Sequence, residues 1–226
     1  MSDPSGAYRR TKRTTLKRLP LRGAYDHERV HAILDRGALC QIGYVAGGQP
    51  LVLPTVYWRD GGRVYWHGSR KSHALAAMAG AEVCFTVSHL DGLVMARSAF
   101  HHSVNYQAVM AFGVARRVDD PPDKRAALQA MFDRLYPGRW ARIRQPSEAE
   151  LAAVTVLYLE LDEVSAKARD APPLDVEEDL AIPVWAGVAP LEVRAGVLQP
   201  CRMSVSDAAI PEGLADWTAG GPAPFR

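Results

Sequence analysis

One stretch of the sequence gathers the side chains that a phosphate group needs. In YWHGSRKSHAL (65–75), a strand-like run ends at Gly68, and Ser69, Arg70 and Lys71 stand just before a predicted helix. Free backbone N–H groups at a helix start favour an anion. Arginine adds bidentate contacts to phosphate and lysine a compact charge. The segment indicates a phosphate site or, equally well on spacing alone, a capped helix with two solvated cations.

A second stretch, FHHSVNYQAV (100–109), is rich in hydrogen-bonding groups. His101 and His102 are adjacent, and Asn105, Tyr106 and Gln107 follow. Neighbouring residues of a strand face opposite ways, so the two histidines cannot easily share one metal. A polar turn and a ligand-facing cluster that donates to phosphate or to a heterocycle both fit better. We favour the ligand-facing cluster.

Two further segments offer contacts to a flat ligand. PLVLPTVYW (50–58) has Pro54 inside a strand, where it removes a ladder donor and favours an edge or a bulge with free backbone groups. An ordinary edge strand is the alternative. Trp185 lies in the Pro- and Gly-rich PVWAGV, where an aromatic ring either plugs a core edge, the commoner case, or stacks on a flat ligand.

HERVH (27–31) matches the zinc-protease pattern HExxH, in which two histidines on one helix face hold the metal. His27 follows the predicted N-cap, Asp26, at once, and no third ligand follows at the spacing of known zinc proteases. We therefore interpret the segment as a solvated or half-buried helix face and predict no metal site.

The hydrophobic pattern predicts short strands joined by tight turns. Helices are expected near 26–36, 72–80, 121–138 and 147–154, and strands at 38–46, 50–58, 63–68, 81–90, 93–99, 104–118 and 155–169. Asp60-Gly61-Gly62 and Asp91-Gly92 are read as hairpin turns, because glycine accepts positive φ. About six strands with few, peripheral helices indicate a mainly β protein, a small antiparallel barrel rather than a parallel α/β fold.

The chain of 226 residues suits one domain with an extension. No apolar run approaches the ~20 residues that span a bilayer, and the N-terminus lacks a signal-peptide core, so we expect a cytoplasmic protein with no membrane partner. Residues 1–22 carry seven Lys/Arg against one Asp. Such an arm could contact nucleic acid or an anionic cofactor. We prefer to interpret it as a solvated arm that crosses a partner subunit, since nothing else in the sequence indicates nucleic-acid binding.

The ordered set of these motifs resembles the pyridoxamine 5'-phosphate oxidase-like, FMN-binding split-barrel family, in the branch that includes nitroimidazole-resistance proteins. The resemblance runs from about residue 10 to 198 and rests on RGAYDHERVHAILDRG, GQPLVLPTVYW, YWHGSRK, DGLVMARSAFHHSVNYQAVMAFG and IPVWAGVAPL. It implies a six-stranded antiparallel split barrel over 23–198, a C-terminal tail over 199–226, and a homodimer with flavin at the subunit interface.

The resemblance also assigns residues to FMN. The strand with Leu53, Pro54 and Thr55 would line the flavin ring, and Ser69, Arg70 and Lys71 would hold the phosphate. Contacts would further come from a list of eight residues: Trp66, His67, His101, His102, Asn105, Tyr106, Gln107 and Trp185. Gln107 and Ala108 replace Arg and Ser of the family's NYRSV. After Trp185 the expected Arg-Leu-His is missing, so we do not expect pyridoxamine phosphate as substrate.

The leading hypothesis is a homodimeric, FMN-dependent oxidoreductase that acts on a small, flat acceptor with NAD(P)H as donor. His67 or His102 would deliver protons, because histidine titrates near neutral pH. Three alternatives stay open: haem binding or degradation with His101 or His102 as axial ligand, a non-catalytic flavin-binding sensor, and a deazaflavin in place of FMN.

Overall fold

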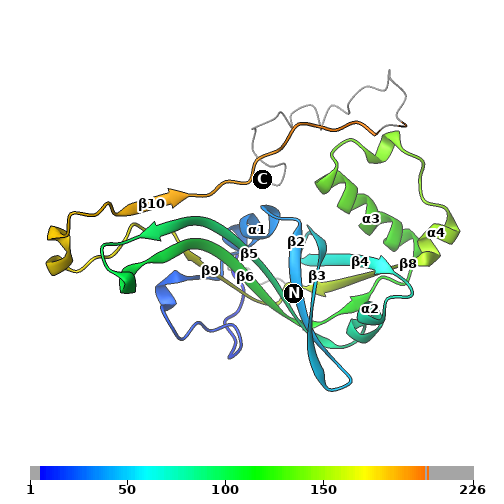
Figure 1. The fold of residues 1–226 in the computed structure, drawn as a ribbon. Coiled ribbons are helices and arrows are strands. Elements are labelled where there is room, and N and C mark those ends of the chain that lie inside the picture. The colour runs from blue at the N-terminus through cyan, green and yellow to red at the C-terminus, as the bar shows by residue number, and fades with distance from the viewer. Residues whose placement is uncertain (1–5, 202, 204–226) are drawn as a thin grey trace.

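The computed structural model describes residues 6–201 and residue 203. Its centre is one antiparallel sheet (Figure 1). The strands are β1 (Gly23–Ala24), β2 (Leu39–Ala46), β3 (Gln49–Asp60), β4 (Arg63–Ser69), β5 (Glu82–Met95), β6 (Ser103–Val114), β7 (Arg116–Arg117), β8 (Val154–Glu160), β9 (Glu163–Arg169) and β10 (Gly187–Pro190). Their order is β1-β9-β6-β5-β2-β3-β4-β8-β7, and β10 pairs with β5. The mainly β, split-barrel prediction is confirmed, with more strands than the predicted six.

Four α-helices lie around the sheet. They are α1 (His27–Asp35), α2 (His73–Met78), α3 (Pro121–Leu135) and α4 (Glu148–Ala153), with 3-10 turns η1 (Pro20–Arg22), η2 (Ala99–His101), η3 (Trp140–Arg142) and η4 (Glu177–Ala181). Asp26 caps α1 as predicted, by accepting a hydrogen bond from the Arg29 backbone at 2.8 Å. Among the described residues, no helix is long and apolar enough to cross a membrane.

Two hydrophobic cores hold the sheet in place. The larger one fills the barrel and includes Val30, Ile33 and Leu34 of α1 with Trp66 and Phe85. In the second, α3 and α4 cover the opposite face of β3, β4 and β8 (Figure 1). Alternation along the strands makes both cores possible, because successive side chains point to opposite faces.

β3 changes partner part-way along its length, and this opens the sheet. Residues Gln49–Val56 pair with β2, whereas Tyr57–Asp60 pair with β4. From His67 onward β4 keeps only β8 as a neighbour, and His67–Ser69 pair with Val154–Val156. The facing edges of β3 and β4 therefore diverge beyond Tyr57 and Trp66. We call this opening, between residues 50–56 and 67–69, the split.

The predicted hairpin at Asp60-Gly61-Gly62 is confirmed, with Gly61 at φ 55°. The predicted turn at Asp91-Gly92 is wrong. β5 runs through it with only a register shift between Leu90 and Gly92, because β10 adds to the strand there and leaves no room for a reversal. The chain reverses instead around η2.

The predicted single strand at 155–169 is also wrong as a continuous element. It breaks at Leu161 and Asp162 into β8, which pairs with β4, and β9, which pairs with β6. Leu161 is buried, and its backbone N–H bonds to the Gly62 carbonyl at 2.8 Å. This contact to the β3–β4 turn redirects the chain from one part of the sheet to the other.

The basic arm packs on the barrel over its described residues. The Tyr8 ring is buried, and its hydroxyl lies 2.8 Å from Nε2 of His31. Arg13 bonds to Glu82 at 2.8 Å and to Glu163. The arm therefore belongs to the folded unit from Tyr8 onward.

Candidate functional site

The split brings together residues predicted from YWHGSRKSHAL and from PLVLPTVYW. Leu53 and Thr55 are half-buried on the core side of β3, and Pro54 is exposed on the other face. His67 and Ser69 lie on the opposite lip. Backbone groups of both lips that face the split have no sheet partner, so a ligand there can use them.

Ser69, Arg70 and Lys71 follow β4 at one end of the split. The Arg70 backbone donates to the Ala153 carbonyl at 2.8 Å, and the Lys71 backbone donates to the Ser69 hydroxyl at 3.2 Å. The turn is thus fixed by its backbone. Both cationic side chains are exposed and make no ion pair or hydrogen bond within residues 6–201. Two unpaired cations on a rigid turn suit a phosphate group.

His67 lies where the two lips meet. Its ring is 5.7 Å from that of Trp58, and its Nδ1 is buried with no hydrogen-bond partner. Burial lowers the pKa of His67, so the imidazole is neutral at pH 7. Trp66, one residue earlier, faces the other way, and its ring is fully buried in the main core.

The two adjacent histidines lie at the reversal between β5 and β6, and one residue orients both. The Ser98 hydroxyl is 2.7 Å from Nδ1 of His101, and the Ser98 carbonyl is 2.9 Å from Nδ1 of His102. Neither Nε2 atom has a hydrogen-bond partner in the described chain. This pattern, one ring nitrogen oriented and the other left open, is typical of metal-ligating histidine.

The remaining polar residues of this reversal are engaged within the chain. Asn105 is buried and accepts from the guanidinium of Arg169 and, at 3.2 Å, from the Ala171 backbone. Gln107 donates to Asp91 at 3.1 Å. Tyr106 is half-buried between its strand neighbours. Asn105 and Gln107 therefore hold this end of the sheet together.

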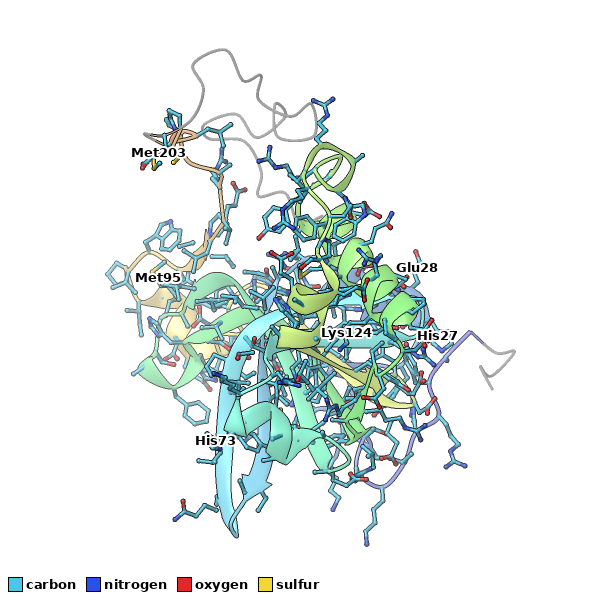
Figure 2. All side chains as sticks on the ribbon, turned by 90° about the vertical axis from the view of Figure 1, so that its right-hand side faces the viewer. His27, Glu28, His73, Met95, Lys124 and Met203 are labelled. Carbon is cyan, nitrogen blue, oxygen red and sulfur yellow. The ribbon has the colours of Figure 1, made fainter. Side chains whose placement is uncertain are left out.

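Trp185 is 66% exposed beside Gly187, on the segment that β10 ties to β5. This end of the sheet points away from β4 and α2 (Figure 1). Met95 at the end of β5 and His73 at the start of α2 are also apart in the second view (Figure 2). One chain therefore carries two groups of candidate residues, the split and the β5–β6 reversal, at different ends.

Sequence reasoning missed Ser98 and Arg169. Ser98 offered a local signal, three residues before His101 in a break between strands. Arg169 offered none, because it meets Asn105 from 64 positions away.

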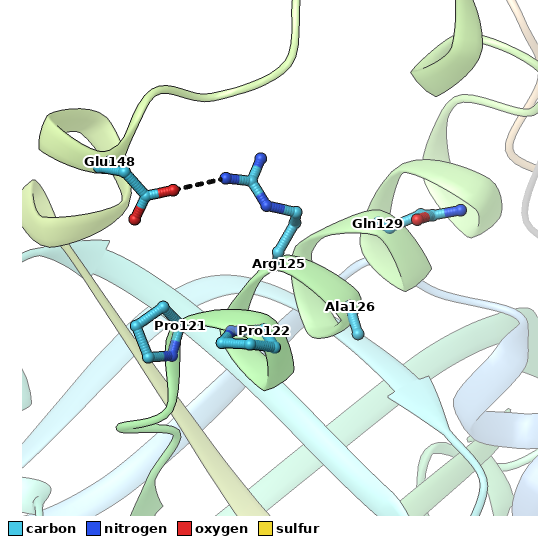
Figure 3. A pocket seen from close by; sticks show the side chains of 6 residues that line it. All are labelled: Pro121, Pro122, Arg125, Ala126, Gln129 and Glu148. Atoms are coloured by element: carbon cyan, nitrogen blue, oxygen red, sulfur yellow. Dashed lines mark hydrogen bonds and ion pairs between the residues drawn. The ribbon is translucent and has the colours of Figure 1, made fainter.

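Two further features lie outside both groups of candidate residues. His27, labelled in Figure 2, stacks on His31 with ring centroids 5.8 Å apart. No group of three His, Cys, Asp or Glu residues able to hold a metal gathers within the described chain. A surface hollow of about 350 Å³ on α3 and α4 contains the 3.0 Å ion pair of Arg125 with Glu148 (Figure 3). None of the predicted site residues lines it.

Comparisons with known proteins found a family model and similar solved structures. A family model described as pyridoxamine 5'-phosphate oxidase matches residues 26–168. The structure of the flavocytochrome Anf3 from Azotobacter vinelandii is 40% identical, with a TM-score of 0.88, over 93% of this chain and 98% of that one. The FAD and heme binding protein from Mycobacterium smegmatis is 33% identical, with a TM-score of 0.84, over 88% and 98%.

A putative 5-nitroimidazole antibiotic resistance protein from Bacteroides thetaiotaomicron shares the fold, at 20% identity and a TM-score of 0.54, over 63% of this chain and 84% of that one. A search of curated proteins found no match. The family model covers more than half of the chain, and the two relatives above 30% identity span nearly all of it. The chain belongs to the pyridoxamine 5'-phosphate oxidase-like family of flavin-binding split-barrel proteins.

Proposed function

We propose that this protein is a homodimeric flavin oxidoreductase that holds FAD in the split and a haem at the β5–β6 reversal. The proposal rests on two sites: the unpaired cations Arg70 and Lys71 beside an open strand edge, and two histidines whose Nε2 atoms have no hydrogen-bond partner in the described chain. The two whole-length relatives are a flavocytochrome and an FAD and heme binding protein. Their names favour FAD over the FMN predicted from sequence.

The residues of the split fit a flavin nucleotide. Arg70 and Lys71 would bind its phosphates, and the backbone of residues 53–55 would accept or donate along the ring edge. His67 offers a buried Nδ1 with no partner, and as a neutral imidazole it can accept a proton at that atom. Flavin supplies hydride and single-electron chemistry when bound, and the protein supplies binding and orientation.

The β5–β6 reversal fits haem through His101 or His102. Ser98 fixes the ring orientation of both histidines through Nδ1, so that Nε2 is the open donor. Imidazole is a common axial ligand of haem iron. The exposed ring of Phe100, which lies edge-on to His101 with centroids 5.2 Å apart, offers an apolar surface to a macrocycle.

The proposed homodimer would form when a second copy of the chain packs on the barrel sheet. Five apolar side chains are exposed on one face of the barrel sheet: Leu39, Val45, Val52, Met110 and Val114. An exposed apolar face of this kind is typical of a protein interface. NAD(P)H as donor and a small, flat acceptor remain part of the proposal.

The test is an absorbance spectrum of the purified protein, followed by denaturation and chromatography of the released flavin. We expect flavin bands, a Soret band, and FAD rather than FMN in the extract. Arg70→Ala/Lys71→Ala should reduce the flavin bands about ten-fold or more and leave the Soret band. His101→Ala and His102→Ala, made singly, should identify the axial ligand by loss of the Soret band.

The matched control is Arg139→Ala/Arg142→Ala, which removes the same charge from an exposed turn outside both sites. It should leave both spectra unchanged. A colourless protein that neither FAD nor FMN alters would refute the flavin proposal. A flavoprotein without a Soret band, even after haem is added, would refute the haem part alone.

A further inference from the structure

An exposed apolar tip lies on the basic arm, in residues 16–23, which we call the arm loop. Leu21 is 101% exposed and Leu19 is 45% exposed, on either side of Pro20. Exposed apolar side chains that lie close together mark interaction surfaces. The flavin and haem sites proposed above do not include this loop.

Hydrogen bonds and packing fix the conformation of the arm loop. The Arg22 backbone donates to the Leu19 carbonyl at 3.0 Å, and Lys167 of β9 donates to the Arg18 carbonyl at 3.4 Å. Gly23 gives room for Leu16, whose Cδ1 would lie 2.6 Å from a Cβ at that position. The loop is thus closed by its backbone and by Leu16, and the other two leucines are left outside.

The backbone at the tip is strained. Leu19 has φ 53°, and it is the single non-glycine residue with positive φ among those the structure describes. A branched side chain in the left-handed region costs free energy, and such strain concentrates at functional positions. A glycine or asparagine would relieve the strain but would remove the apolar side chain.

Cations surround the tip and lack counter-charges. Lys17, Arg18 and Arg22 lie within the loop, and no carboxylate pairs with any of them in residues 6–201. Within residues 6–22, only Arg13 forms ion pairs, with Glu82 and Glu163. The arm loop therefore presents an apolar point within a field of unneutralised positive charge.

We propose that the arm loop docks on an anionic lipid surface, with Leu19 and Leu21 in the interface and the cations on lipid phosphates. A convex apolar tip with basic flanks is the combination that binds anionic bilayers, whereas a protein partner would have to supply both a socket and acidic side chains. The lack of long apolar runs in the sequence argues against a spanning segment and not against surface docking.

The experiment is co-sedimentation of the whole protein with vesicles of phosphatidylcholine, pure or mixed with phosphatidylglycerol. We expect binding to the mixed vesicles alone, and release at high salt. Lys17→Gln/Arg18→Gln should weaken binding by about 30-fold, since two surface cations are lost. Leu21→Ser should weaken it by about ten-fold.

Two matched controls separate the arm loop from general charge and apolarity. Arg139→Gln/Arg142→Gln changes the net charge equally at another exposed turn, and Leu174→Ser changes a leucine that is 63% exposed elsewhere. Neither should alter vesicle binding. The proposal is overturned if the wild type ignores mixed vesicles at low salt, or if the controls weaken binding as much as the loop variants. It is equally overturned if Leu21→Ser disrupts the dimer, which would assign the loop to a second copy.

Discussion

Arg134 of α3 fastens the end of α1 to the rest of the barrel, and its removal should destabilise the fold measurably. Its guanidinium donates to the Asp35 carboxylate at 2.7 Å and to the carbonyls of Leu34, Asp35 and Gly37 at 3.0, 2.9 and 2.5 Å. The last carbonyls of a helix have no intrahelical donor, so an outside donor is needed. The perturbation is Arg134→Ala.

Two of the acceptors at the end of α1 keep another donor after the substitution. The Leu34 carbonyl keeps its bond from the Tyr57 hydroxyl, and the Asp35 carboxylate keeps Arg59 at 2.9 Å. The carbonyls of Asp35 and Gly37 lose their charged donor. At roughly 1.5 kcal/mol for each hydrogen bond to a charged group, the expected loss of unfolding free energy is about 3 kcal/mol. Arg134→Lys should recover less than half, because an ammonium cannot reproduce the planar fork.

Urea denaturation followed by circular dichroism measures this loss as a lower midpoint at constant slope. Arg139→Ala is the control, since its exposed side chain bonds to nothing in the described structure, and it should stay within about 0.5 kcal/mol of the wild type. A loss below about 1 kcal/mol for Arg134→Ala would show that water replaces the guanidinium at the helix end, contrary to our reasoning.

Three further predictions concern the site. Burial lowers the pKa of His67, so the stability linked to its neutral form is present above its ordinary pKa of about 6.5 and is lost as the pH falls. In urea denaturation, His67→Gln should therefore reduce the fall of the unfolding free energy with decreasing pH, by at most about 1.4 kcal/mol per pH unit. An unchanged slope would contradict this. Ser98→Ala removes the hydrogen bond to Nδ1 of His101, so it should shift the Soret band but not the flavin bands. Identical spectra would show that His101 is not the haem ligand. Gly187→Ala would put Cβ 2.7 Å from Cζ2 of Trp185, so the ring must move. Tryptophan emission should change, and the change should vanish in a Trp185→Phe background.

The hairpin turns show where sequence reasoning succeeds and where it stops. Asp60-Gly61-Gly62 forms a turn because local chemistry is enough there, with Gly61 at positive φ. Asp91-Gly92 has nearly the same composition but stays in a strand. Its conformation is decided by distant partners, since Asp91 pairs with Arg36 and Gly92 lies against β10. Turn propensity cannot reveal such contacts.

The candidate site residues also fall into those predictable from local sequence and those set by distant contacts. Ser69, Arg70 and Lys71 are contiguous, so their shared position at the end of β4 followed from the sequence. The buried contact of Asn105 with Arg169 depends on the pairing of β6 with β9. This pairing was not predicted, because residues 155–169 were interpreted as one continuous strand. The family resemblance supplied the flavin, and only the whole-length relatives pointed to FAD and haem together.

β1 and β7, the strands at the two ends of the main strand order, are only two residues long each. A long, free strand edge is a template on which another chain can add, and short edge strands deny it that template. β1 pairs with Ala166 and Lys167 of β9, and the arm beside it bonds to Glu163 and Lys167. The arm and β1 therefore cover the outer edge of β9 and oppose edge-to-edge aggregation. Deleting the arm together with β1 should expose this edge and promote self-association.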